Sequence, residues 1–349
     1  MSSNSAISTS EVDPTFPQSS ATPAPIPSIH LIDSFSGGKG KSTFARFIAH
    51  HIDFHLLAAK VIDADVGHNI KPYYPDTLEI DIRANKDYTS DEVTRYLRGG
   101  LSLFINFPGS SFEFSSHWLQ DHNLTALQLL PSDSPDHCFD LVTQPRFGAL
   151  NVVQLQQGEA KAQDQAQRRG QSSPPSASPR IVRWFLSGCT EDDAAEFRRT
   201  VEYYDHNHPG HLTHVLVRNN ALLPNALRPN WDPLYSVSGF REFLQRPDLY
   251  DIEFPRLEHR EMNLLQREKL KYVAGVMHPD WELISRSRID RFLVAATQQI
   301  EQCGLLAEIP SLEAVLHPEQ VAPNPTEPNG ASPPKAKTPR RRSTKTQKS

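Results

Sequence analysis

The segment 36–43, Ser-Gly-Gly-Lys-Gly-Lys-Ser-Thr, constrains the fold more than any other part of this 349-residue chain. It follows the short apolar run 29–33, which predicts a buried strand. It precedes residues 42–54, whose apolar side chains recur at helical spacing. A glycine-rich turn that joins a buried strand directly to a helix predicts the first unit of an α/β domain.

The glycines of this segment allow the backbone to wrap around an anion and to point its N–H groups toward it. The N-terminus of the following helix adds a positive dipole. We therefore expect a ligand that carries phosphate groups and Mg²⁺, with Lys41 at the terminal phosphates and the Ser42 hydroxyl on Mg²⁺. The alternative is a surface turn rich in glycine and lysine. The expected nucleotide-binding residues here are Gly37, Gly38, Lys39, Gly40, Lys41, Ser42 and Thr43.

Three stretches have a composition that cannot bury enough apolar area to offset the entropy of ordering. They are the Ser/Pro/Thr-rich segment 1–28, the Gln/Ala/Ser/Pro-rich segment 155–180 and the Pro-rich segment 317–349. We expect all three to be disordered. The remaining residues, 29–154 and 181–316, are numerous enough for a single domain with one sizeable core.

Predicted strands alternate with predicted helices along these two stretches. This order predicts an α/β fold, a doubly wound and mostly parallel sheet of the P-loop NTPase type, with ligands at the carboxyl ends of its strands. Ser90 and Thr190 are expected to begin helices as N-caps. The further strands are expected at 56–62, 101–107, 181–187 and 212–218, and the further helices at 90–98, 111–122, 190–204, 259–275 and 283–303.

Several classes of protein are excluded by composition. No stretch is long and apolar enough for a transmembrane helix, and the N-terminus lacks the pattern of a secretory signal. The three cysteines are an odd number without CxxC spacing, which favours a reducing cytoplasm. Residues 205–214 are rich in possible metal ligands, but their spacing matches no standard zinc pattern, so we expect a solvated loop.

Charge is distributed unevenly. The tail 331–349 carries a formal +7 in a chain of −5, so the remainder carries −12. The acidic body has no general affinity for polyanions, and any attraction to nucleic acid or to an acidic partner is expected from the tail. The alternative is a tail that only improves solubility.

The loop resembles the compressed form K-G-G-x-G-K-[ST] of the ParA/MinD family of deviant Walker ATPases. A second match is Val61-Ile62-Asp63-Ala64-Asp65, an apolar strand that ends in D-x-D. The resemblance implies that Asp63 acts near Mg²⁺, that Asp65 orients the attacking water, and that Lys41, Asp63 and Asp65 are the catalytic residues. A surface turn with two solvated acids is the alternative for this segment.

Two more segments extend the resemblance. Residues 103–109 match the Walker B strand of the family, with Asn106 in place of its aspartate. The resemblance thus implies Ser42, Asp63 and Asn106 at the metal. Residues 215–219 match a strand that ends in an asparagine at the adenine edge, here Asn219. An amide donates and accepts at once, which suits a purine edge, although Asn219 also suits a turn after a strand.

Within the family, the chain is most similar to the TraL-like branch of plasmid conjugal transfer. This similarity rests on 108–119, 252–257 and 285–293. Two departures matter. Ser36 stands where the family has a lysine that reaches the partner's nucleotide, a role that Lys39 would fill only in part. Asn106 lacks the charge of the family's aspartate, which removes a negative charge beside a metal.

These features predict a Mg·ATP-operated switch with slow hydrolysis, accessory to plasmid transfer or mobilisation, in the cytoplasm. Alternatives are a plasmid or chromosome partition ATPase and a catalytically silent nucleotide-binding adaptor. A small-molecule kinase is disfavoured because residues 188–250 contain no arginine-rich lid. The expected partners are a second copy of the chain in a nucleotide-dependent homodimer, and DNA or a protein of the conjugation machinery that contacts the basic tail 331–349.

Overall fold

The computed structural model describes residues 26–65, 67, 69–82, 84, 86–110, 112–121, 124, 179–222 and 230–316. The expected disordered segments lie almost entirely outside these residues, so their disorder stays a prediction. The strands are β1 (Ser28–Asp33), β2 (Ala59–Asp63), β3 (Leu78–Glu79), β4 (Ser102–Asn106), β5 (Arg180–Ser187), β6 (Leu212–Asn219) and β7 (Leu249–Phe254). The helices are α1 (Lys41–His55), α2 (Lys86–Arg98), α3 (Phe112–Asp121), α6 (Glu191–Asn207), α7 (Asp232–Tyr235), α8 (Phe240–Phe243), α9 (His259–Glu268), α10 (Tyr272–Val276), α11 (Leu283–Gln302) and α12 (Leu312–Leu316), with a 3₁₀ turn at Asn220–Leu222.

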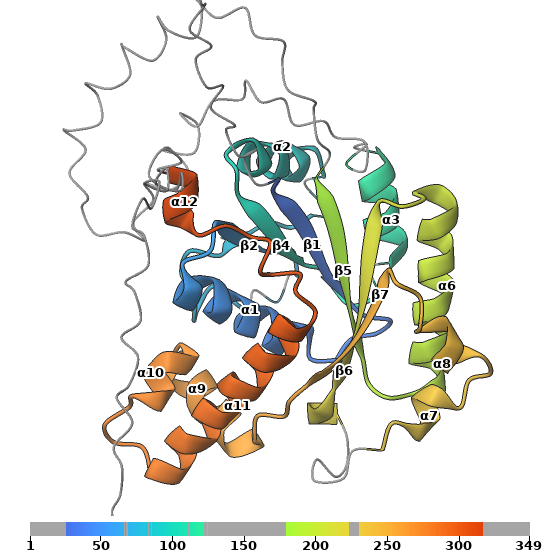
Figure 1. Cartoon of the computed structure of the whole chain (residues 1–349). Coiled ribbons are helices and arrows are strands. Elements are labelled where there is room, and N and C mark those ends of the chain that lie inside the picture. Colours follow the sequence, from blue (N-terminus) through green and yellow to red (C-terminus); the bar gives the residue numbers. More distant parts are fainter. Residues whose placement is uncertain are drawn as a thin grey trace, which may run out of the picture. The chain divides into compact units, whose positions relative to one another are not determined.

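The strands form one sheet in the order β3-β2-β4-β1-β5-β6-β7 (Figure 1). Every neighbouring pair of strands is parallel. The chain first builds the sheet on one side of β1, through β4, and then crosses to the other side at β5. The predicted α/β fold with a doubly wound parallel sheet is thereby confirmed, and the turn after β1 lies where such sheets bind ligands.

Helices cover both faces of the sheet (Figure 1). On one face, α1, α9, α10 and α11 pack over alternate strand residues such as Ile32, Phe104 and Val215. On the other face, α2, α3 and α6 pack over the intervening residues, among them Leu31, Ile105 and Phe185. Strands buried on both faces are continuous apolar runs, which explains why residues 29–32 and 103–105 contain few polar side chains.

The structure confirms the N-cap at Thr190. Its hydroxyl accepts from Asp193 N, and the Asp193 carboxylate accepts from the N-cap backbone, which completes a capping box for α6. The N-cap prediction for Ser90 is wrong, because α2 already begins at Lys86. The Ser90 hydroxyl instead accepts a hydrogen bond from Trp118 Nε1 at 3.1 Å, which ties α2 to α3.

Other boundaries also differ from the sequence analysis. The helix expected over 259–275 is two helices, α9 and α10, because Lys269 adopts a left-handed conformation with φ of 51°. β1 and β5 each begin one residue earlier than expected, at Ser28 and Arg180. β7 was not predicted; it is an edge strand, and intermediate or exposed residues interrupt its buried ones, whereas the central strands β1, β4 and β5 are buried almost throughout.

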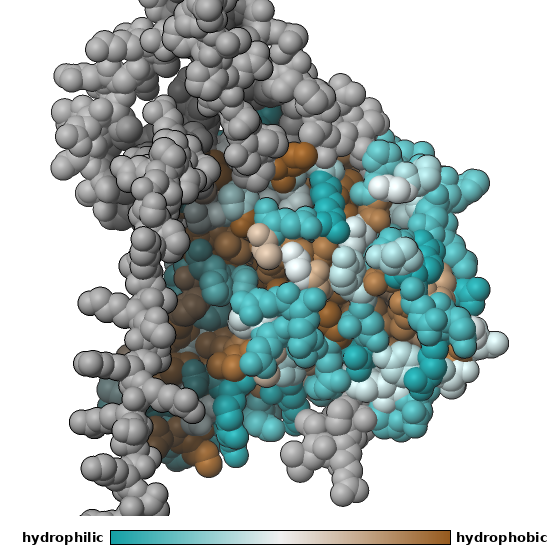
Figure 2. Space-filling view, viewed as in Figure 1, coloured by the Kyte–Doolittle hydropathy of each residue, from teal (hydrophilic) through white to brown (hydrophobic). Residues whose placement is uncertain are grey.

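Among the described residues, none of the helices combines the length and the apolar content that a membrane span requires. Hydrophilic side chains dominate the surface over α6, α7 and α8 in the view of Figure 2.

Candidate functional site: a phosphate loop at the carboxyl edge of the sheet

Polar residues end five adjacent strands at one edge of the sheet. They are Asp63 of β2, Asn106 of β4, Asp33 of β1, Ser187 of β5 and Asn219 of β6, and all five are buried. The strand register places Asn106 beside both Asp63 and Ile32. In open α/β sheets, ligands bind at the carboxyl ends of the strands, and buried polar residues gather at that edge here.

The loop between β1 and α1 rises from this edge. Gly38 and Gly40 have φ of 76° and 84°, a left-handed conformation that favours glycine. Gly40 is also the N-cap of α1. A side chain at Gly40 is excluded for a second reason, because a Cβ there would lie 2.2 Å from Asn219 Nδ2.

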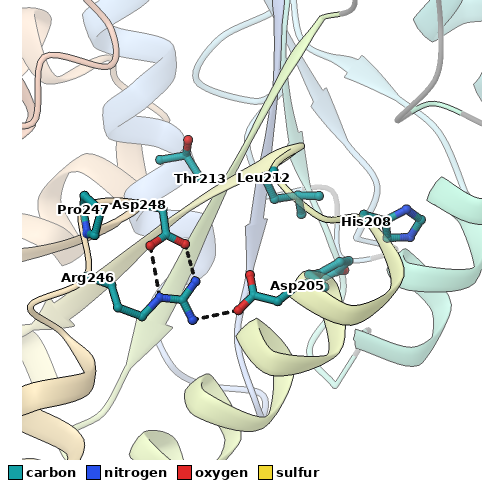
Figure 3. A pocket seen from close by; sticks show the side chains of 9 residues that line it. Asp205, His208, Leu212, Thr213, Arg246, Pro247 and Asp248 are labelled. Carbon is teal, nitrogen blue, oxygen red and sulfur yellow. Dashed lines mark hydrogen bonds and ion pairs between the residues drawn. The ribbon is translucent and has the colours of Figure 1, made fainter.

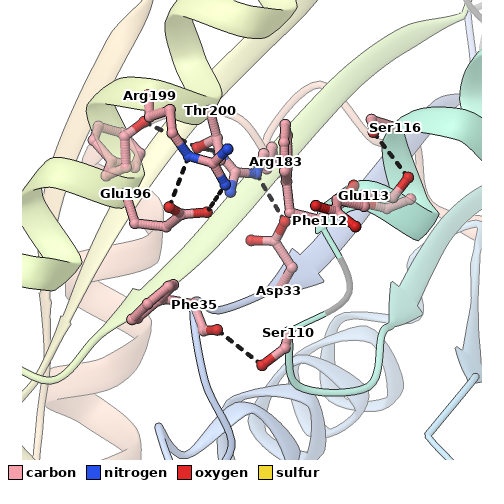
Figure 4. A network of polar contacts seen from close by, with 12 residues as sticks. Asp33, Phe35, Ser110, Phe112, Glu113, Ser116, Arg183, Glu196, Arg199 and Thr200 are labelled. Carbon is pink, nitrogen blue, oxygen red and sulfur yellow. Dashed lines mark hydrogen bonds and ion pairs between the residues drawn. The ribbon is translucent and has the colours of Figure 1, made fainter.

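Three side chains hold carbonyl groups of the loop. The Ser34 hydroxyl donates to Ser36 O at 2.7 Å, and the Ser110 hydroxyl donates to Phe35 O at 3.0 Å (Figure 4). Asn219 Nδ2 donates to Lys39 O at 2.8 Å. With its carbonyl groups bonded in this way, the loop has its N–H groups available for another partner.

The backbone N–H groups of residues 36–42 have no acceptor within the described part of the chain. The last of them belong to the first turn of α1, where the helix dipole adds partial positive charge. Successive unpaired N–H groups at the N-terminus of a 15-residue helix form an anion-binding concavity. The geometry therefore fits a phosphate group better than any cation or apolar ligand.

Lys41 is the charged side chain of this concavity. It is 5% exposed, and its ammonium forms no hydrogen bond or ion pair among the residues that the structure describes. Burial lowers its pKa, while the carboxylates of Asp65 and Asp33 act in the opposite direction. A buried ammonium that faces acids without pairing with them is ready for an anionic ligand.

Asp63 and Asn106 are in direct contact below the loop. Asn106 Nδ2 donates to Asp63 Oδ1 at 2.8 Å, and Asp63 Oδ2 accepts from Ile70 N at 3.3 Å. Burial raises the pKa of Asp63, partly offset by the hydrogen bond from Asn106. Asp65 is half-buried and donates its backbone N–H to Asp63 Oδ1 at 3.4 Å. The two expected catalytic acids are therefore neighbours.

The donor chemistry of this region fits Mg²⁺. Ser42 supplies a hydroxyl, Asp63 a carboxylate and Asn106 an amide oxygen, which are the oxygen ligands that Mg²⁺ prefers. Asn106 Oδ1 is buried and has no hydrogen-bond partner among the described residues, so its acceptor capacity is unused there. Bound there, Mg²⁺ would neutralise the charge of the phosphates.

The remaining predicted residues have other partners. Lys39 directs its ammonium to Asp193 Oδ2 at 3.0 Å, so its side chain is paired within its own chain. The Thr43 hydroxyl accepts from Arg46 Nη2 at 3.4 Å in the first turn of α1. Asn219 is 1% exposed, and its amide is bonded to the loop backbone.

Sequence reasoning missed three residues around the loop. Asp33, Arg183 and Asp193 are buried and charged, and Asp33 and Arg183 form an ion pair at 2.8 Å (Figure 4). One available signal was Arg183 itself, a charge inside an otherwise apolar strand. Gly109 ends the segment 103–109 that resembles the Walker B strand, and a side chain there would crowd the loop, because a Cβ would lie 2.9 Å from Gly37 N.

A hollow of about 370 Å³ lies at the opposite, amino edge of the sheet (Figure 3). Arg246 crosses it and pairs with Asp205 and Asp248 at 2.7 and 2.5 Å. The expectation of a solvated loop at 205–214 is wrong in part, because His208 and His214 are buried. Within the described ranges, no three side chains of His, Cys, Asp or Glu are grouped so that they could hold a metal ion.

Comparison with known proteins adds the following. No protein-family model matches the chain, and no curated protein is significantly similar to it. One of the solved structures that match is described as a nucleotide-binding protein in complex with ADP from Archaeoglobus fulgidus. It is 13% identical, has a TM-score of 0.38, and the match covers 72% of this chain and 89% of that chain. At that identity and TM-score the likeness identifies no family.

The fold and the site define a class all the same. The chain is a doubly wound α/β protein whose loop after β1 presents backbone N–H groups without acceptors, among the described residues, at the carboxyl edge of its parallel sheet.

Proposed function

We propose that the chain binds Mg·ATP in the loop 36–42 and acts as a nucleotide-operated switch with slow hydrolysis. The observation that carries this proposal is the run of N–H groups without acceptors at the start of α1, together with the unpaired ammonium of Lys41. A nucleotide supplies several phosphate oxygens, so it satisfies both features at once.

Slow hydrolysis follows from the contact between Asn106 and Asp63. In this position an amide supplies no negative charge, and its N–H donates to the carboxylate that is proposed to hold Mg²⁺. Asp65 is proposed to orient the attacking water, as a carboxylate beside the loop suits that role. The contact also favours a second candidate, a catalytically silent adaptor that binds nucleotide without turnover.

The setting of this switch is proposed from the sequence resemblance to the ParA/MinD family and its TraL-like branch. The switch is proposed to act in the cytoplasm, in plasmid transfer or partition. Its proposed partners are a second copy of the chain, in a nucleotide-dependent homodimer, and DNA or a protein that contacts the basic tail. The proposed adenine contact of Asn219 has the same basis. For that contact Asn219 would use capacity beyond its bonds to Lys39 O and Ala221 N.

Calorimetry with Mg·ATP, Mg·ADP and AMP, run beside a phosphate-release assay, tests the proposal. The wild type is expected to bind the di- and triphosphate and to release phosphate slowly. Lys41→Ala is expected to lose at least about tenfold in affinity, because a charged hydrogen bond is worth about 1.5–3 kcal/mol.

Lys271→Ala is the matched control. It removes a lysine that pairs with Asp53 at 2.6 Å near the far end of α1, and it is expected to bind as the wild type does. Absence of binding in the wild type, or equal binding by Lys41→Ala, would reject the nucleotide site. Binding without any phosphate release would select the adaptor.

A further inference from the structure

A buried ion pair fixes the chain just before the phosphate loop. Asp33, the last residue of β1, accepts from Arg183 Nε at 2.8 Å, and their side chains are 3% and 1% exposed. Arg183 extends further and donates through Nη1 to the Thr200 hydroxyl at 2.5 Å (Figure 4). Thr200 belongs to α6, so the entrance to the loop is linked to that helix.

A second ion pair fixes the end of the loop to the same helix. Lys39 Nζ lies 3.0 Å from Asp193 Oδ2, and the side chains are 15% and 0% exposed. The lysine passes close to Gly188, where a Cβ would lie 2.7 Å from Nζ and 3.1 Å from Cδ. The pair is therefore housed in a shaped slot, unlike a chance contact on the surface.

The carboxylate of Asp193 is also held by contacts that do not involve Lys39. Its Oδ2 atom also accepts from Gly188 N at 2.8 Å and from the Thr190 hydroxyl at 2.8 Å. These bonds belong to the capping box and the turn before α6. Because the capping interactions of α6 fix this carboxylate, they also fix where the Lys39 ammonium can pair with it. The position of the loop at Lys39 therefore depends on the position of α6.

Asp193 and Thr200 lie seven residues apart, which is about two turns, and therefore project from the same face of α6. Both are fully buried. One face of one helix thus holds the chain before the N–H groups 36–42, through Asp33 and Arg183, and among them, through Lys39. Since breaking a buried pair leaves an uncompensated charge, these links resist distortion more than exposed ion pairs do.

We propose that α6 is a brace that positions the phosphate loop, and that Lys39 and Asp193 are positioning residues of the nucleotide site. Lys39 acts from within its own chain, holding the loop so that its N–H groups converge before the phosphates arrive. This inference rests on the proposed nucleotide binding. It adds Asp193 of α6, a residue outside the loop motif, to the residues on which the affinity for nucleotide depends.

A double-mutant cycle on the affinity for Mg·ATP tests the brace. Lys39→Met and Asp193→Asn are each expected to weaken binding on the order of tenfold, the effect of one charged hydrogen bond. The double variant is expected to bind Mg·ATP no more weakly than the single variant with the lower affinity, because both substitutions break the same ion pair. Lys39→Arg, which retains the ion pair, is expected to restore most of the affinity.

The Lys271–Asp53 pair provides the matched control cycle, since it joins the same residue types away from the loop. Lys271→Met and Asp53→Asn are expected to leave the affinity unchanged. Because Asp193 also caps α6, Lys39→Met is the decisive variant. Affinities of Lys39→Met and the wild type that agree within twofold would overturn the brace.

Hydrogen exchange without nucleotide separates the brace from the proposed function. The amides of residues 36–42 are expected to exchange faster in Lys39→Met than in the wild type, with no change in Lys271→Met. If Lys39→Met exchanges faster than the wild type but the wild type binds no nucleotide, the brace is retained and the proposed function is rejected. Unchanged exchange in Lys39→Met would likewise reject the brace, and Mg·ATP binding by both proteins would then leave the nucleotide site standing.

Discussion

At the scale of single residues, the contact of Asn106 with Asp63 gives a specific prediction for the stability of the folded chain. Both side chains are fully buried, and they share one hydrogen bond of 2.8 Å. In Asn106→Asp a second carboxylate replaces the donor, and without Mg²⁺ the free energy of unfolding is expected to fall by about 2–4 kcal/mol. Added Mg²⁺ is expected to recover part of this loss, as judged by urea unfolding with and without the metal.

Asn263→Asp is the control for this substitution. Asn263 is exposed on α9, and the change there is expected to stay within about 0.5 kcal/mol. An Asn106→Asp protein as stable as the wild type in the absence of Mg²⁺ would show that the two side chains do not share a closed environment.

His30 makes the folded state sensitive to acid. It is fully buried in β1, Trp184 Nε1 donates to its Nδ1 at 3.1 Å, and burial lowers its pKa to about 3. Between pH 6.5 and 3 the unfolded chain therefore binds a proton that the folded chain does not. The free energy of unfolding is expected to fall with pH in this range, by about 1.4 kcal/mol per pH unit from His30.

His30→Gln isolates this contribution. His50 and His51, whose pKa values are lowered to about 4, act in the same direction in both proteins. Urea unfolding between pH 6 and 4.5 is expected to show a shallower pH dependence for His30→Gln, by about one proton. Equal slopes would mean that His30 is already protonated in the folded chain.

The limits of sequence reasoning are clearest at this scale. The positions of Lys41, Ser42, Asp63 and Asn106 near the carboxyl edge of the sheet could be expected, because these residues follow predicted strands or the glycine-rich turn. Their roles stay predictions, and those of Asp63 and Asn106 rest on the family resemblance. Arg183 and Asp193 could not, because their partners lie 150 and 154 residues away along the chain. No local periodicity encodes a pair of that kind.

At the scale of elements, the turn between β4 and α3 supports the loop by direct backbone contact. A Cβ on Gly109 would lie 2.9 Å from Gly37 N and 3.0 Å from Gly37 Cα. Gly109→Ala is therefore expected to displace the loop, with a loss of about 1–3 kcal/mol in stability and a clear loss of Mg·ATP affinity. Thermal unfolding and calorimetry on the same samples measure the two effects.

Gly304→Ala is the matched control for backbone strain. Gly304 has φ of 69°, nothing lies within 4 Å of an added Cβ, and it follows α11, away from the loop. It is expected to cost about 1 kcal/mol in stability without loss of affinity. Intact affinity in Gly109→Ala would contradict a supporting role for this turn.

Most elements could be predicted from periodicity and capping chemistry, and the errors have local causes. Thr190 was identified as an N-cap because three acids follow it. Ser90 was misassigned because the acids after it resemble a first helical turn, whereas the helix had already begun. β7 was missed because Asp251 and Glu253 interrupt its apolar residues, so it lacks the continuous apolar run that identified the central strands.

At the scale of the whole molecule, the loop, the Asp33–Arg183 and Lys39–Asp193 pairs and the acids Asp63 and Asp65 come from one chain. The proposed phosphate site is therefore built from one chain, which suits the proposed switch, in which nucleotide binds first and the proposed partner follows. The paired Lys39 fits this order, because its ammonium is occupied within the chain.

Hydrogen–deuterium exchange with and without Mg·ATP tests the central claim most directly, because it reports on the amides that the claim concerns. The account predicts that Mg·ATP slows exchange at residues 36–42 and in the first turn of α1, and that Lys41→Ala reduces this protection. Unchanged exchange at 36–42 at saturating Mg·ATP, or protection confined to another part of the chain, would contradict it.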